Sequence, residues 1–264
     1  MNLRKKLTCA ALVLAFTAGV VFAGPGGQSG ASGIDAIKAR GVLRVGVKSD
    51  VPGFGLQNPE TGLYEGMEIE ISKLLAKEIF GDPSKVAFTP VTAKTRGPLL
   101  DNGDIDFVIA TFTVTEERKL TYNFSSIYYT DGIGLLVKTS SGIKSFKDAA
   151  NKTIGVAQSA TTRASLEAAA KDQNIRVTFA EFATYPEIKA ALDSGRVQVF
   201  SVDKAILRGY LDSESLILPD TFSPQPYGVA TKLNNNALAA WVDGQITKWL
   251  SDGTIDALVK QFDL

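Results

Sequence analysis

The chain has 264 residues, of which 45% are hydrophobic, and its 28 basic side chains balance its 28 acidic ones. Its single cysteine and its lack of histidine exclude a histidine-based catalytic triad, a disulfide framework and the usual zinc sites. The balanced charge gives no general basic surface for nucleic acid, and the length is typical of one large or two medium-sized domains.

The first 23 residues have the pattern of a cleavable secretory signal. Three basic residues at positions 4–6 precede a mostly apolar stretch that runs to about Val20, and small residues follow it. The apolar stretch is short for a membrane-spanning helix, and an uncleaved anchor is the alternative. Cleavage would remove Cys9 and leave a weakly acidic mature chain. Residues 24–33 are half glycine and are expected to form a flexible leader.

From Ile34 onward, short β-branched runs alternate with segments of helical periodicity, which is typical of an α/β protein with largely parallel sheets. The first half predicts strands over 42–47, 86–91 and 105–109, helices over 67–80 and 96–102, and a helical turn over 115–120. After an extended segment at 132–137, the second half predicts strands over 153–157, 176–179 and 197–202, and helices over 161–172, 186–194 and 203–211.

A further extended piece over 227–231 precedes two predicted helices, near 238–250 and 254–262. The two groups of strand–helix units are similar in size. We therefore expect two α/β lobes instead of one large sheet.

Residues 110–118, with the sequence Ala-Thr-Phe-Thr-Val-Thr-Glu-Glu-Arg, follow directly on a predicted strand and enter a helix. Free backbone N–H groups at a helix start favour an anion. Thr113 and Glu116 have the spacing of a capping box, and Arg118 lies about one turn into the helix, where its guanidinium can bind a carboxylate through two hydrogen bonds. The alternative is that Arg118 is a solvated charge and the threonines only cap the helix.

This motif belongs to a series that resembles a known family, the bacterial extracytoplasmic solute-binding proteins of family 3, which bind polar amino acids for ABC importers. The series consists of 66–71, 105–110 with 113–119, 123–125 and 128–129, and the resemblance covers essentially all of 34–264. Within the family the chain looks closest to aspartate/glutamate-binding members, through 94–103, 201–204 and 224–228. Met67 departs from the family pattern, which usually has an aromatic residue there.

The resemblance implies a two-lobed periplasmic-binding-protein fold, in which each lobe is a mostly parallel sheet flanked by helices. Two crossover strands, around 131–137 and 222–231, would join the lobes. Lobe 1 would comprise 34–132 and 227–264, and lobe 2 would comprise 133–226. The family's function implies one ligand in the cleft, hinge closure, and delivery to a membrane permease by a monomeric, periplasmic or otherwise extracytoplasmic protein without a cofactor or metal.

The resemblance places Arg118 and Thr113 on the ligand's α-carboxylate and Asp203 on its α-ammonium, and it puts Lys48 and Arg96 in cleft positions. Three cations would then face one carboxylate. Burying two spare cations is costly unless the ligand brings another anion, so aspartate or glutamate is the expected ligand. The remaining expected ligand-binding residues are Thr111, Thr161, Thr162 and Tyr227.

Each of these residues also has a plainer reading. Arg96 and Lys48 can be surface charges, Asp203 and the two threonines at 161 and 162 can be helix caps, and Tyr227 can be a core side chain. Other functions also stay open at this point: binding of a different polar amino acid, a cyclohexadienyl dehydratase-like enzyme with Glu181 as its general acid, or the ligand-sensing module of a receptor.

Overall fold

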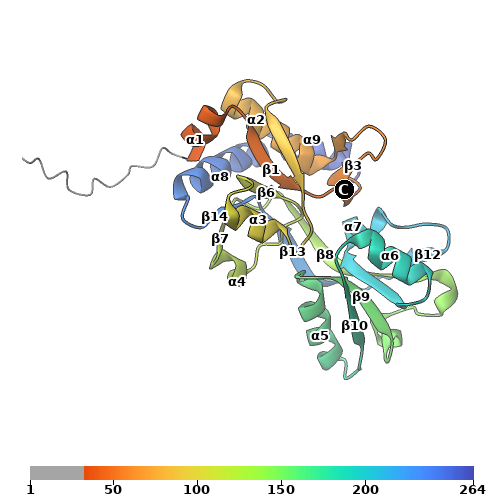
Figure 1. Ribbon diagram of the computed structural model, residues 1–264. Helices are drawn as coiled ribbons and strands as arrows, with labels where there is room; N and C mark the ends of the chain where they lie inside the picture. The colour runs from red at the N-terminus through yellow and green to blue at the C-terminus, as the bar shows by residue number, and fades with distance from the viewer. Residues whose placement is uncertain (1–32) are drawn as a thin grey trace, which may run out of the picture. The chain divides into compact units, whose positions relative to one another are not determined.

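The computed structural model describes residues 33–264 (Figure 1). The signal expected over 1–23 and all but the last residue of the expected leader lie outside the described residues. Gly33, that last residue, begins helix α1 (Gly33–Arg40). Within the described part of the chain, no helix is long and apolar enough to cross a membrane.

The first sheet has five strands in the order β5-β1-β6-β14-β7. Strand β1 (Leu43–Val47) runs parallel to β5 (Val86–Pro90) and β6 (Phe107–Ile109). Strand β14 (Ala230–Lys232) runs antiparallel to β6 and to β7 (Tyr122–Phe124). This sheet is in contact with helices α2 (Met67–Phe80), α3 (Arg96–Asn102) and α8 (Asn236–Ser251), and α9 (Thr254–Gln261) packs on α2 and α8. We call the sheet and these helices the first lobe.

The second sheet has the order β10-β9-β11-β8-β12, and β13 also pairs with β8. Strand β9 (Thr153–Ala157) runs parallel to β10 (Thr178–Phe182) and β11 (Val199–Asp203). Strand β8 (Tyr129–Lys138) runs antiparallel to β11, β12 (Ser215–Ile217) and β13 (Phe222–Tyr227). Helices α5 (Thr162–Asp172), α6 (Tyr185–Asp193) and α7 (Lys204–Arg208) contact this sheet, and together they form the second lobe.

The expected α/β fold with two lobes is confirmed, but the sheets are mixed instead of mostly parallel. In each sheet, the strands that pair in parallel are connected through helices. The antiparallel pairs involve β8, β13 and β14, which belong to the segments where the chain passes from one lobe to the other. A connection that returns from the other lobe has no crossover helix, so nothing requires its strand to run parallel.

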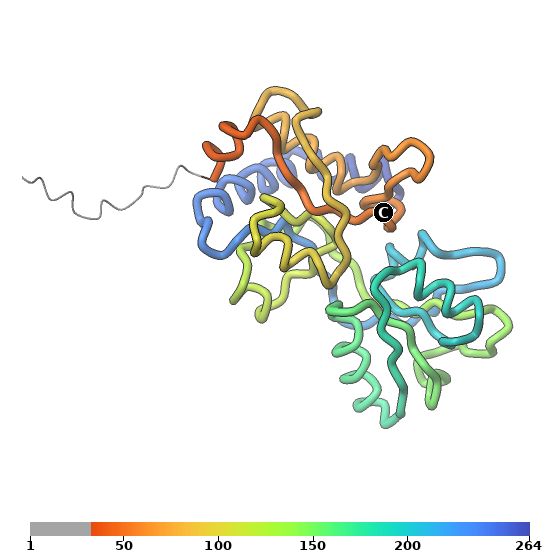
Figure 2. The backbone as a smooth tube through the Cα atoms, in the orientation of Figure 1, coloured from red at the N-terminus to blue at the C-terminus, as the bar shows by residue number. Residues whose placement is uncertain are grey.

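The two crossover segments run side by side (Figure 2). Tyr129 of β8 lies opposite Tyr227 of β13, and the backbone N–H of Tyr128 donates to the carbonyl of Tyr227 at 3.0 Å. A second bond joins the N–H of Ser125 to the carbonyl of Val229 at 2.9 Å. The predicted connections around 131–137 and 222–231 therefore pair with each other.

Long periodic segments were predicted well, whereas short elements were missed. The bounds of α2 and α3 agree with the prediction, but the small sheet of β2 (Asp50–Val51), β3 (Gly55–Gln57) and β4 (Tyr64–Glu65) was not predicted. Strand β10 also begins two residues later than expected. Elements of two or three residues are too short for a periodic pattern, so they depend on their partners.

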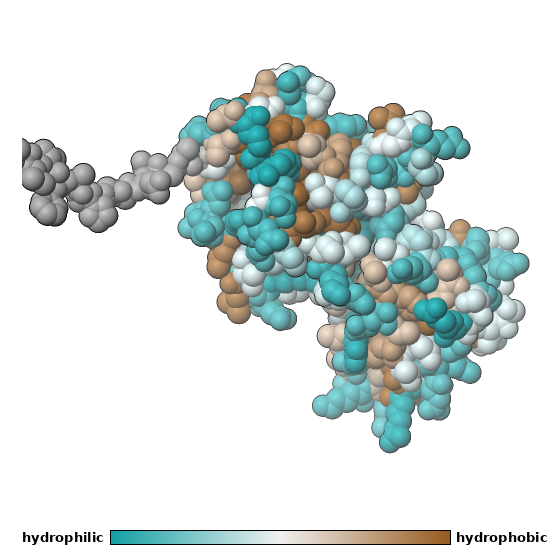
Figure 3. All heavy atoms as spheres, viewed as in Figure 1, coloured by the Kyte–Doolittle hydropathy of each residue, from teal (hydrophilic) through white to brown (hydrophobic). Residues whose placement is uncertain are grey.

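Apolar side chains pack between the sheets and their helices, and polar ones cover much of the surface. In the first lobe Val45 and Val47 of β1 are fully buried with Ile71 and Leu75 of α2. Hydrophilic side chains dominate the face shown in Figure 3, where hydrophobic atoms show mainly along the strands of the two sheets. Buried polar side chains are therefore the unusual feature, and several of them lie at one edge of each sheet.

Candidate functional site

The predicted site residues gather at the carboxyl ends of parallel strands. Lys48 follows β1, Thr111 follows β6, Thr161 follows β9, and Asp203 is the last residue of β11. In open α/β sheets this edge is where ligands bind, because the loops after parallel strands converge there. Tyr227 ends crossover strand β13 and joins the same group.

Seven of the nine predicted site residues are buried, with exposed fractions of 5% or less. They are Lys48, Arg96, Thr111, Thr113, Thr162, Asp203 and Tyr227. The plainer readings of Lys48 and Arg96 as surface charges are therefore wrong. Arg118 and Thr161 are partly buried. We call the nine predicted site residues, together with the side chains that are hydrogen-bonded or ion-paired to them, the polar group.

Arg118 contacts both lobes. Its Nη1 donates to the carbonyl of Thr113 at 2.8 Å, and its Nη2 donates to the carbonyl of Ser159, in the second lobe, at 3.2 Å. Burial, and secondarily repulsion from Arg96, lowers the pKa of Arg118 to about 9. A guanidinium with a depressed pKa gains when an anion arrives beside it.

The predicted capping box of Thr113 and Glu116 is wrong. Helix α4 (Glu116–Lys119) begins later, and Thr115 is its N-cap, with an Oγ1 that accepts from the N–H of Arg118 at 3.1 Å. Thr113 stays extended because it forms an isolated β-bridge with Tyr227. This long-range pairing leaves the Thr113 hydroxyl free to point into the polar group.

Arg96 is held by main-chain carbonyls. Its Nη1 donates to the carbonyls of Ala110 at 2.7 Å and Thr111 at 3.0 Å. The centre of the Phe112 ring lies 4.1 Å from the Arg96 guanidinium and 4.8 Å from that of Arg118, so one aromatic ring attracts both cations. The Nε of Arg96 is buried without a hydrogen-bond partner.

Lys48 already has an acidic partner that the sequence reading did not identify. Its Nζ lies 3.0 Å from Oδ1 of Asp50 and 4.4 Å from the centre of the Tyr185 ring, which belongs to the second lobe. Burial lowers the pKa of Lys48, and the Asp50 carboxylate opposes this effect. Asp50 lies in the short strand β2, which has no periodic signal.

Glu68 is a second carboxylate that the sequence reading did not include. It lies in the first turn of α2 and is fully buried, and its Oε1 accepts from the N–H of Thr111 and from the hydroxyl of Tyr128, each at 2.6 Å. Burial raises the pKa of Glu68 to about 7, although these bonds, Arg96 and Lys48 favour its charge. Acidic residues are common in the first turn of a helix, so its position along the chain does not mark Glu68 as part of a site.

Asp203 binds the hydroxyl of Tyr227, which donates to its Oδ2. Burial raises the pKa of Asp203 to about 7, against the effects of Tyr227, Arg96 and Arg118. The side chain makes no capping hydrogen bond to α7, so the plain helix-cap reading of Asp203 is wrong. Tyr227 is itself fixed by stacking on Tyr129 at 5.8 Å and by the edge of Phe54 at 5.7 Å.

Gln225, which the sequence reading also missed, connects the two lobes. Its Oε1 accepts from the hydroxyls of Thr113 at 2.8 Å and Thr161 at 2.7 Å, and its Nε2 donates to the carbonyl of Ser223 at 3.0 Å. The bond to Ser223 fixes the orientation of the amide, so both threonine hydroxyls must donate to Gln225. Thr161 precedes α5 without capping it through its side chain, while Thr162 is buried as the first residue of that helix.

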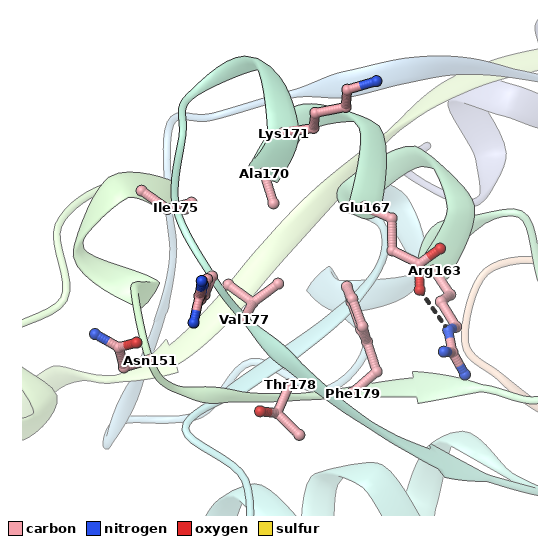
Figure 4. A pocket seen from close by; sticks show the side chains of 10 residues that line it. Asn151, Arg163, Glu167, Ala170, Lys171, Ile175, Val177, Thr178 and Phe179 are labelled. Atoms are coloured by element: carbon pink, nitrogen blue, oxygen red, sulfur yellow. Dashed lines mark hydrogen bonds and ion pairs between the residues drawn. The ribbon is translucent and has the colours of Figure 1, made fainter.

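Two grooves differ in their position relative to this polar group. One, of about 580 Å³, is lined by both lobes, including Arg118, Tyr122, Ser159 and Thr161, and opens beside the buried residues. The other, of about 720 Å³, lies between α5 and β10 of the second lobe and is lined by none of the predicted site residues (Figure 4).

The groove on the second lobe is lined by Arg163, which pairs with Glu181, the general acid of the enzyme alternative. Arg163 at its side pairs with Glu167 at 2.8 Å and with Glu181 at 2.9 Å. The side chain of Glu181 is 40% exposed and is bound to this arginine. Glu181 therefore has neither the burial nor the neighbours of the polar group, and the structure does not support it as a general acid there.

Comparisons with known proteins agree with this geometry. A family model described as bacterial extracellular solute-binding proteins, family 3, matches residues 43–263. The ABC transporter glutamine-binding protein GlnH of Bacillus subtilis is 37% identical over 98% of this chain and 97% of its own length. A glutamine-binding protein of Geobacillus stearothermophilus is 42% identical over 77% of this chain and 78% of its own length.

A similar solved structure is that of an ancestral arginine-binding protein bound to arginine. It is 34% identical, with a TM-score of 0.75, over 84% of this chain and 98% of its own. These matches confirm the predicted resemblance and fold class. The two relatives are named for glutamine, whereas the sequence reading favoured aspartate or glutamate.

Proposed function

We propose that this chain, which belongs to the bacterial extracellular solute-binding proteins of family 3, binds glutamine between its two lobes and delivers it to an ABC importer. The broader role follows from the family: the chain is an amino-acid-binding component of an ABC transporter, and its relatives are binding proteins, not enzymes. The choice of glutamine is our inference from the charges of the site.

The observation that carries the proposal is the charge balance of the polar group. Lys48, Arg96 and Arg118 supply three positive charges, and Asp203, Asp50 and Glu68 supply three negative ones when all three are ionised. Three carboxylates, and not one, face the three cations, so the charges no longer favour an acidic ligand. A balanced site favours a ligand whose own charges cancel, because any net charge would be buried without compensation.

The roles of the residues follow from charge and position. Arg118 would bind the α-carboxylate, and Asp203 would bind the α-ammonium with Tyr227 orienting it. Arg96 and Lys48 would surround the side-chain amide, whose oxygen can accept from the unpartnered Nε of Arg96. Thr111, Thr113, Thr161 and Thr162 would supply main-chain N–H groups and hydroxyl oxygens around the ligand.

Binding would proceed by closure of the lobes. Residues from both lobes contribute to the polar group, and the crossover strands β8 and β13 connect them. A ligand that touches both sets of residues stabilises the closed form by its differential affinity for the two forms. In this proposal lobe 1 comprises 34–132 and 227–264, lobe 2 comprises 133–226, and the closed monomer is recognised by the permease outside the cytoplasm after cleavage of residues 1–23.

Glutamate is the second candidate, and Glu68 is the observation that favours it. Because burial raises the pKa of Glu68 to about 7, part of the population carries a proton there at neutral pH. The site then has one uncompensated positive charge, which a side-chain carboxylate can pair.

Calorimetric titration of the purified, ligand-free chain tests the proposal. Glutamine, glutamate, aspartate and arginine are titrated in turn at pH 7.5, with prephenate as the control for an enzymatic reading. We expect one-to-one binding that is tightest for glutamine. Tightest binding of glutamate or aspartate would restore the acidic ligand, and consumption of prephenate without amino-acid binding would overturn the transport role.

A further inference from the structure

We propose that Glu68 determines specificity. Its buried carboxylate neutralises Arg96 and Lys48 at the side-chain end of the cleft, where the side chain of the ligand would lie, and makes the site prefer an amide to a carboxylate on the ligand. This inference deepens the proposed function and rests on it.

The hydrogen bonds of Glu68 hold its charge in place without cancelling it. Its Oε1 receives two neutral donors, the N–H of Thr111 and the hydroxyl of Tyr128, each at 2.6 Å. Its Oε2 is buried without a hydrogen-bond partner. The negative charge therefore acts on its surroundings through a medium from which water is excluded, where electrostatic interactions are screened little.

The charge acts on the two cations at the side-chain end of the cleft. Both Arg96 and Lys48 interact electrostatically with Glu68. Thr111 links Glu68 to Arg96 directly, because its N–H donates to Glu68 while its carbonyl accepts from Arg96 at 3.0 Å. Whatever binds beside Arg96 is therefore also exposed to the field of Glu68.

The backbone conformation of Thr111 indicates that the contacts joining Glu68 to Arg96 impose conformational strain. Thr111 has a φ of 45°, in the left-handed region that a β-branched residue rarely adopts. Such a conformation persists only where neighbouring contacts impose it. Here Glu68 fixes the N–H of Thr111 and Arg96 fixes its carbonyl, so the strain is located at the residue that joins the carboxylate to the cation.

An ionised Glu68 disfavours a second carboxylate but not an amide. Glutamate would place its side-chain charge beside cations that Glu68 and Asp50 already compensate. Glutamine brings no net charge, and its side-chain amide can both accept and donate hydrogen bonds. Removing the charge of Glu68 should therefore improve glutamate relative to glutamine.

The substitution Glu68→Gln tests this inference by keeping shape and the Oε1 acceptor while removing the charge. The quantity to measure is the ratio of dissociation constants for glutamine and glutamate, with asparagine and aspartate as a second pair. We expect the ratio to shift toward the acidic ligand by at least about tenfold. Glu70→Gln is the matched control, because it removes the same charge from the same helix at a residue that pairs with Lys73, and it should leave the ratio unchanged.

The pH dependence of the unmodified chain gives a second test that needs no substitution. Lowering the pH from 8 to 6 protonates Glu68 and should shift the ratio in the same direction as Glu68→Gln. Asp203 also titrates near pH 7, but it faces the α-ammonium that both ligands share, so its effect cancels in the ratio. The other groups that face Glu68 are Arg96, Tyr128 and Lys48, and only the shift caused by Glu68 should disappear in Glu68→Gln.

The outcomes separate the two proposals. If the unmodified chain binds glutamine but the ratio is the same in Glu68→Gln, or both ligands weaken equally, the specificity role is overturned and the proposed function stands. A chain that binds none of the four amino acids overturns both. Thermal unfolding of the variant, compared with the Glu70→Gln control, shows whether a loss of binding reflects a loss of folding.

Discussion

At the scale of single residues, the site consists of charges that have lost their water and lack a full set of partners. Burial raises the pKa of Asp203 to about 7 and lowers that of Arg118 to about 9. Both shifts arise mainly from burial, which disfavours the charged forms. In the proposed function an amino acid would supply further partners, with its carboxylate for Arg118 and its ammonium for Asp203.

Removal of Arg118 should weaken every amino-acid ligand. Arg118→Ala deletes the cation that we propose binds the α-carboxylate, so we expect a loss of about 2–5 kcal/mol for glutamine and glutamate alike. The measurement is calorimetric titration at pH 7.5. Arg176→Ala, which removes an exposed arginine beside the groove between α5 and β10, is the control and should bind as the unmodified chain does. Equal binding by both variants would contradict the role of Arg118.

Ligand binding should release protons at pH 7. The α-ammonium lowers the pKa of Asp203, so the fraction of Asp203 that is protonated in the free chain loses its proton, and about half a proton should appear per glutamine bound. Calorimetry in buffers of different ionisation enthalpy measures this number. Glutamate should release less, because Glu68 takes up protons beside a new carboxylate. Affinity should fall as the pH drops below about 7, because a protonated Asp203 no longer pairs with the α-ammonium.

At the scale of elements, the entry into α2 decides where Glu68 lies. Gly66 precedes the helix with a φ of 126°, and a Cβ at this position would lie 2.2 Å from the carbonyl oxygen of Phe54. Main-chain hydrogen bonds from Met67 to Gly53 and from Glu68 to Phe54 hold the helix start against this loop. Glycine is required because both the backbone angle and the space exclude a side chain.

Gly66→Ala should therefore destabilise the chain and disturb the site. We expect the free energy of unfolding to fall by more than about 2 kcal/mol, because alanine meets both the unfavourable φ and the Phe54 carbonyl. Denaturant unfolding measures the change. Gly62→Ala is the control: its φ is 71° but no atom lies within 4 Å of the added Cβ, so only the backbone cost of about 1 kcal/mol applies. Equal effects of the two substitutions would show that the contact with Phe54 is unimportant.

At the scale of the whole molecule, contacts outside the polar group also join the lobes. A Cβ on Gly209, which follows α7, would lie 2.8 Å from the nearest ring carbons of Pro52 in the first lobe. The hydroxyl of Tyr210 donates to the carbonyl of Asp50. These contacts need the lobes to be close, so in the proposed function they belong to the closed form that ligand binding would favour.

Gly209→Leu should keep the lobes apart without unfolding either of them. Gly209 has a φ of −67°, which leucine adopts readily, and the added side chain meets the rigid ring of Pro52. We expect weaker glutamine binding and, in small-angle X-ray scattering with saturating ligand, a larger radius of gyration than for the unmodified chain. Gly244→Leu, at an open position within α8, is the control. An unchanged affinity and radius in Gly209→Leu would contradict the role of closure.

The sequence predicted the elements that depend on local patterns and missed those that depend on distant partners. Helix α2 has apolar residues at helical spacing over 14 residues, and its bounds were predicted correctly. The sheet of β2, β3 and β4 consists of strands of two or three residues, which no periodic pattern marks. The capping box failed for the same reason, because the distant Tyr227 holds Thr113 extended.

The sequence by itself determined the family and the two α/β lobes, and it pointed to the nine proposed site residues, because motifs and strand–helix alternation are local properties of the chain. Only the tertiary structure decided the charge balance among them. Glu68 meets Thr111 across 43 residues, and Gln225 meets Thr113 across 112. The partner of a buried charge depends on how the lobes pack in space, and a pattern along the chain carries no information about that distance.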